Sequence, residues 1–122
     1  MKPLLTLGDL EGLTQEQLQQ HIIDSYHAKP EEVVGFTFLV AYESVGDYGC
    51  DSSSFFLVEK DGVIYENHGG HCSCYGFEDQ WEPEATNADY LKSDKFGFST
   101  GGYDGHSDDN KSVITTYITE NL

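Results

Sequence analysis

A chain of 122 residues with 13% aromatic residues is long enough for one domain, residues 1–122, with its own hydrophobic core. The chain is strongly acidic, because 22 Asp and Glu residues face six lysines and no arginine, giving a net charge of −16. This charge repels phosphate backbones and anionic membranes, so we expect neither nucleic acid nor membrane as a direct partner. The N-terminal residues contain no apolar stretch that could be a signal peptide or a membrane span, so we expect a cytoplasmic protein.

The N-terminal part predicts one helix after an irregular segment. Residues 1–12 show no hydrophobic period and are expected to be an irregular lead-in. Thr14 and Gln17 have the spacing of a capping box, which predicts a helix over residues 15–26. Its apolar stripe consists of Leu18, Ile22, Ile23 and Tyr26.

The next segments predict strands. Residues 33–42 read VVGFTFLVAY, and both faces of the predicted strand are apolar, as is typical of a central or covered strand. One face would carry Val34, Phe36, Phe38, Val40 and Tyr42. After a loop at 43–53, residues 54–60 and 63–68 flank an Asp-Gly turn and predict a β-hairpin. A sequential order of these strands would give an antiparallel meander.

The C-terminal half is less regular. Residues 69–84 are rich in glycine and show no period, which predicts a long ordered loop. Residues 86–93 predict a short helix capped by Thr86. In residues 107–122, β-branched residues favour a strand, but apolar residues at helical spacing behind Ser107 favour a helix, which we prefer. The spaced residues are Ile114, Tyr117, Ile118 and Leu122.

These elements predict an α+β fold. We expect an antiparallel sheet of three or more strands, with an N-terminal helix and a C-terminal helix packed on it. The predicted core consists of Leu18, Ile22, Val34, Phe36, Phe38, Val40, Phe56, Val58, Ile64, Trp81, Ile114 and Ile118.

Cysteine and histidine residues form the first candidate site. In a meander, the loop that holds Cys50 and the segment after the third strand lie at the same end of the sheet. Cys50, Cys72, Cys74 and either His71 or His68 would then provide a Cys₃His set for Zn²⁺, with His71 preferred. A disulfide from Cys50, a catalytic cysteine beside a histidine, and semi-buried cysteines without a special role remain alternatives.

Acidic residues form the second candidate site. Glu78, Asp79, Glu82 and Glu84 surround Trp81 with no lysine between them. A solvated charged face is the ordinary interpretation of such a run. The alternative is a partner-binding surface whose carboxylates take the place of phosphates. Trp81 would then fix the run to the core.

Three stretches of the chain resemble a known group of small proteins. Residues 46–50 (GDYGC), 60–66 (KDGVIYE) and 70–84 (GHCSCYGFEDQWEPE) look like the pattern of small tailed-phage and bacterial proteins with an HCSCYG…QWEPE motif. The resemblance covers about the middle third of the chain. The chain departs from the pattern by a glycine between Tyr48 and Cys50. The resemblance implies a phage or mobile-element origin and no particular mechanism.

The leading functional hypothesis is a binding protein and not an enzyme. An acidic, arginine-free protein of phage type would occupy the basic, nucleic-acid-binding site of a host protein in the host cytoplasm, as an inhibitor with an anti-defence role. The alternative is a small structural zinc domain with Zn²⁺ as its cofactor. A Cys/His hydrolase or transferase is the third hypothesis.

Overall fold

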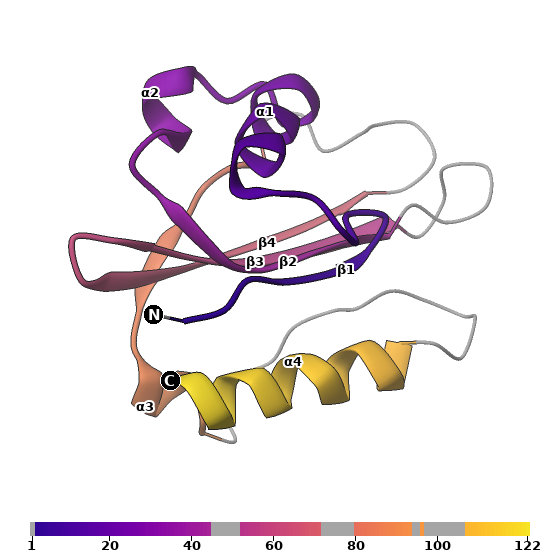
Figure 1. Ribbon diagram of the computed structural model, residues 1–122, viewed down its shortest axis with the longest axis vertical. Helices are drawn as coiled ribbons and strands as arrows, with labels where there is room; N and C mark the ends of the chain where they lie inside the picture. Colours follow the sequence, from indigo (N-terminus) through magenta and orange to yellow (C-terminus); the bar gives the residue numbers. More distant parts are fainter. Residues whose placement is uncertain (1, 45–51, 72–79, 94–95, 97–106) are drawn as a thin grey trace.

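The computed structural model describes residues 2–44, 52–71, 80–93, 96 and 107–122. Five strands form one sheet in the order β1-β2-β3-β4-β5. They are β1 (Leu5–Gly8), β2 (Thr37–Ser44), β3 (Ser52–Lys60), β4 (Val63–His71) and β5 (Glu84–Thr86). The helices are α1 (Gln15–Ser25), α2 (Pro30–Val33), α3 (Ala88–Leu91) and α4 (Ser107–Asn121). Helices α1 and α2 lie over one face of the sheet and α4 over the other (Figure 1).

This architecture confirms the predicted α+β fold with its N-terminal and C-terminal helices. The sheet divides the buried side chains into two clusters. One packs beneath α1 and contains Leu18, Ile22, Phe56 and Trp81. The other packs against α4 and contains Phe55, Leu57, Ile114 and Ile118. Within the described residues, no helix combines the length and the apolar character needed to cross a membrane.

The expectation of an irregular lead-in over residues 1–12 is wrong. Residues Leu5–Gly8 form strand β1, which pairs in parallel with β2, Leu5 opposite Val40 and Gly8 opposite Glu43. Parallel strands need a crossover connection, and α1 and α2 provide it. Four residues are too few to show a hydrophobic period, so the sequence of this segment alone does not indicate a strand. The strand forms because it pairs with β2, which is distant in the sequence.

Helix α1 forms as its capping box predicts. The Thr14 hydroxyl accepts from the backbone N–H of Gln17 at 3.2 Å, and Gln17 Oε1 accepts from the N–H of Thr14 at 2.9 Å. The Gln15 amide also bonds both the N–H and the C=O of Phe38, each at 2.7 Å. The start of the helix is therefore fixed to the start of β2.

Strand β2 begins later than the predicted strand over 33–42. Pro30 takes the first position of the short helix α2, where its fixed φ is compatible with helix and its missing N–H costs nothing. Gly35 then turns the chain at a φ of +102°, and the strand starts at Thr37. Val34 is consequently 59% exposed and does not belong to the core, contrary to the prediction.

A β-bulge also divides the residues that were expected on one face of β2. The register with β3 shifts between Phe38 and Val40. Phe38 therefore packs beneath α1, whereas Val40 and Tyr42 pack against α4. An extra residue reverses the alternation of side chains, which sequence periodicity cannot show.

The hairpin of β3 and β4 is confirmed and is longer than predicted. Asp61 and Gly62 both have positive φ, 54° and 81°, as a two-residue type I′ turn requires. The pairing continues to Ser52 opposite His71, so Gly69 and Gly70 belong to β4 and not to the predicted loop at 69–84. Small residues pair with one another here, such as Ser54 with Gly69. They do not give the pattern of large apolar residues that predicts a strand, so the prediction ended too early.

The last elements also differ in detail from the prediction. Glu84 to Thr86 form the edge strand β5, and the short helix that follows is capped by Asn87, whose Oδ1 accepts from the Tyr90 N–H at 2.8 Å, and not by Thr86. The helix predicted over 107–122 is confirmed as α4. Ile114, Tyr117 and Ile118 are buried together, since the helical spacing brings all three to the sheet.

Candidate functional site

The described residues include only part of each predicted site. Of the acidic run, Glu82 and Glu84 are described, and Glu78 and Asp79 lie outside the described residues. Of the proposed zinc ligands, Cys50, Cys72 and Cys74 lie outside them. His71 is the last residue of β4, and its side chain is likewise outside the described part.

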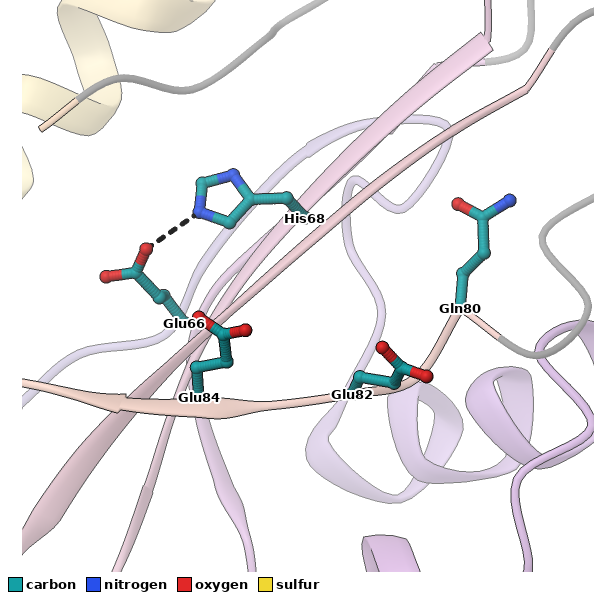
Figure 2. A pocket seen from close by; sticks show the side chains of 5 residues that line it. All are labelled: Glu66, His68, Gln80, Glu82 and Glu84. Atoms are coloured by element: carbon teal, nitrogen blue, oxygen red, sulfur yellow. Dashed lines mark hydrogen bonds and ion pairs between the residues drawn. The ribbon is translucent and has the colours of Figure 1, made fainter.

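Glu82 and Glu84 line a pocket of about 220 Å³ beside the start of β5 (Figure 2). The other described lining residues are Glu66, His68 and Gln80. Three carboxylates therefore line one pocket, and none of its described lining residues is a lysine.

Strand geometry brings these side chains together. Glu66 and His68 are alternate residues of β4 and so lie on the same face of the sheet. Glu84 pairs directly with Glu66, which places their two carboxylates on that face as well. Like charges opposite one another destabilise an antiparallel pair, so stability alone does not favour this arrangement. Such a cost is typical of a site that serves a function.

His68 forms one wall of the pocket. Its Nε2 lies 3.0 Å from Glu66 Oε1 (Figure 2). The ring packs against Phe55, with 5.1 Å between centroids, and against Phe96 at 6.2 Å. The histidine thus adds an aromatic surface beside the carboxylates. Sequence reasoning considered His68 only as a spare zinc ligand and missed Glu66, because the pairing of Glu66 with Glu84 needs the fold.

Buried side chains hold the backbone under Glu82 and Glu84 in place. Asn67, 2% exposed, donates through Nδ2 to the Gln80 carbonyl at 3.1 Å and accepts at Oδ1 from the Glu82 N–H at 2.7 Å. Trp81, which stands between Gln80 and Glu82 in the sequence, is 6% exposed and donates from Nε1 to the Glu32 carbonyl at 3.1 Å. Trp81 is therefore the anchor that the sequence predicted.

The donor set defines what the pocket can bind. Carboxylates accept hydrogen bonds and attract positive charge, so a group with N–H donors and a positive charge suits it, such as an ammonium or a guanidinium. Among the described residues, no group of three or more His, Cys, Asp or Glu side chains is placed to hold a metal ion. The described lining of the pocket therefore suits a cationic side chain.

The strand order supports the premise of the cysteine hypothesis without testing it. The expected meander is confirmed, and Ser52 pairs with His71 at the end of the hairpin away from the Asp61–Gly62 turn. Cys50 precedes Ser52 by two positions and Cys72 follows His71 directly in the sequence. The convergence of the cysteines stays a prediction.

Comparison with known proteins adds no relative, because no family model, curated protein or solved structure matches the chain. The resemblance to small phage proteins is therefore still a prediction.

Proposed function

We propose that this protein is an acidic binding protein that occupies the basic, nucleic-acid-binding site of another protein and so inhibits it. The observation that carries the proposal is the pocket that Glu66, Glu82 and Glu84 line together, with no lysine among the lining residues that the structure describes. The resemblance to phage proteins suggests a host defence or nucleic-acid-handling protein as the target.

Order in the backbone supports this role. A flexible acidic loop would lose conformational entropy on binding, whereas Glu82 and Glu84 stand on backbone that Asn67 and Trp81 already hold. The partner's lysine or arginine side chains would meet carboxylates carried on ordered backbone, as they meet phosphates in nucleic acid. The net charge of −16 would accelerate the encounter and make it sensitive to salt.

Charge reversal at the pocket tests the proposal. The partner is captured from host lysate at low salt, purified, and its affinity measured for the wild type and for the double variant Glu82→Lys, Glu84→Lys. We expect the variant to bind about tenfold more weakly or worse, and we expect duplex DNA to displace the wild type. The control variant Glu11→Lys, Glu120→Lys makes the same change in net charge at two exposed sites far apart in the sequence and should bind normally.

Two outcomes would contradict the proposal. Equal loss in both variants would mean that only net charge matters and that the pocket has no special part. Undiminished binding of the pocket variant across salt concentrations would remove this acidic surface from recognition altogether.

A structural zinc site is the second candidate, and the observation that favours it is the pairing of Ser52 with His71. Zinc would be held by Cys50, His71, Cys72 and Cys74 and would stabilise the end of the hairpin. Elemental analysis of the purified protein should then find about one zinc per chain, and a chelator should lower the melting temperature. A metal-free protein whose melting temperature ignores both chelator and added Zn²⁺ would exclude this candidate.

A further inference from the structure

Glu43 is a buried carboxylate at the junction of three elements. Glu43 is 5% exposed and lies in β2, opposite Gly8 of β1. Its Oε1 accepts from the Tyr26 hydroxyl at 2.7 Å and lies 2.9 Å from Nε2 of His21 in α1. Its backbone carbonyl accepts from the Asp9 N–H at 2.7 Å. One residue thus connects α1, the end of β1 and the end of β2.

A carboxylate this deeply buried is costly unless donors compensate its charge. Tyr26 is a neutral donor, and burial raises the pKa of its hydroxyl far above neutral pH, so its hydrogen bond does not change in the working range. His21 is different, because a histidine gains or loses its charge near neutral pH. Among the described contacts of the Glu43 side chain, the hydrogen bond with His21 is therefore the one whose strength changes with pH near neutrality.

We propose that His21, Tyr26 and Glu43 form a proton-operated clamp between α1 and the sheet, tight when His21 is charged and looser when it is neutral. The neutral Nε2–H tautomer still donates to Glu43, but a charge-assisted hydrogen bond is roughly twice as strong as a neutral one. Weakening it favours local opening of α1, the helix whose Leu18 and Ile22 side chains are buried in the core.

The negative charges around His21 favour its charged form. The pKa of His21 is raised from its ordinary value of 6.5, chiefly by the hydrogen bond to Glu43. Partial burial opposes this shift, and the negative charges of Glu43, Asp24 and Asp9 add to it. Because the folded pKa lies above the unfolded one, the clamp's contribution is complete below pH 6.5 and is lost as pH rises through the folded pKa.

Hydrogen exchange tests the clamp at the level of α1. Protection factors of the Ile22 and Tyr26 amides, corrected for intrinsic rates, are measured at about pH 5.5 and pH 8, with the Ile118 amide of α4 as internal reference. In the wild type, protection of α1 relative to α4 should fall about fivefold on going to the higher pH, the difference between a charged and a neutral hydrogen bond.

Three variants make the test specific. Glu43→Gln keeps an acceptor for both donors but removes the charge, and His21→Gln removes the titrating group, so either variant should abolish the pH step. His27→Asn removes an exposed histidine from the turn after α1, at a positive φ of 56° that asparagine tolerates, and should retain the step. A wild type whose α1 protection does not change with pH, or a Glu43→Gln protein that keeps the full change, would overturn the proposal.

Discussion

Trp81 belongs at the same time to the core and to the acidic pocket. Its ring packs near Phe38 and Phe56, at 6.0 Å and 5.8 Å between centroids, while the next residue, Glu82, faces the pocket. This arrangement was predictable from the sequence, because a single tryptophan among carboxylates has few ways to be satisfied except as an anchor. The role of Asn67 was not predictable, because an asparagine within a strand gives no sign of the distant backbone that it bonds.

Substitutions at Trp81 should separate the contribution of its ring packing to stability from that of its indole hydrogen bond. Trp81→Ala removes a buried ring and should lower the free energy of unfolding by about 3–5 kcal/mol. Trp81→Phe keeps most of the packing and loses the indole donor to the Glu32 carbonyl, so it should cost only about 1–2 kcal/mol. Urea denaturation measures both values. Equal losses would show that the hydrogen bond, and not the packing, dominates at this position.

At the scale of elements, the signals contained within a segment were reliable and those that depend on a distant partner were not. The capping box of α1, the Asp61–Gly62 turn and the spacing of Ile114 and Ile118 are local, and each gave the element that the structure has. Strand β1 and the bulge in β2 depend on pairing across the sheet. The same limit hid Glu66 from the predicted site, because its neighbour Glu84 comes from another strand.

Gly8 should be the position in β1 that tolerates substitution least. A Cβ built there would lie 2.3 Å from the Glu43 carbonyl oxygen, and φ is +67°. Gly8→Ala should therefore separate β1 from β2 and destabilise the protein well beyond the backbone cost of about 1–2 kcal/mol. Gly12→Ala is the matched control, because φ is +88° but a Cβ there meets nothing within 4 Å. Thermal unfolding of the two variants should rank Gly8→Ala clearly below Gly12→Ala, and the reverse order would contradict the contact.

At the scale of the whole molecule, charge acts against the fold. A net charge of −16 on 122 residues makes the folded chain repel itself, and compaction increases this repulsion. Two of the described pairs that relieve it are Lys2 with Glu59 and His21 with Glu43, at 2.9 Å each. The excess of acidic residues is thus a cost to stability.

Salt should therefore stabilise the protein. Raising NaCl from about 0.02 M to 0.3 M shortens the screening length several-fold, so the repulsion weakens and the melting temperature should rise. The variant Glu82→Lys, Glu84→Lys carries less negative charge and should show a smaller rise. A melting temperature that falls with NaCl would mean that attractive pairs outweigh the general repulsion.

The hydroxyl of Tyr117 donates to the carbonyl of Pro3 at 2.6 Å and joins segments that are 114 positions apart. On the ribosome, the β2–β4 meander can form from neighbouring segments, but the segment before β1 cannot make this contact until α4 has emerged. Until then, the face of the sheet that α4 covers, with Phe55 and Leu57, is open to water or to a chaperone. The nascent chain therefore passes through a stage in which an acidic protein exposes one apolar surface, and slow translation of the α4 segment would prolong that exposure.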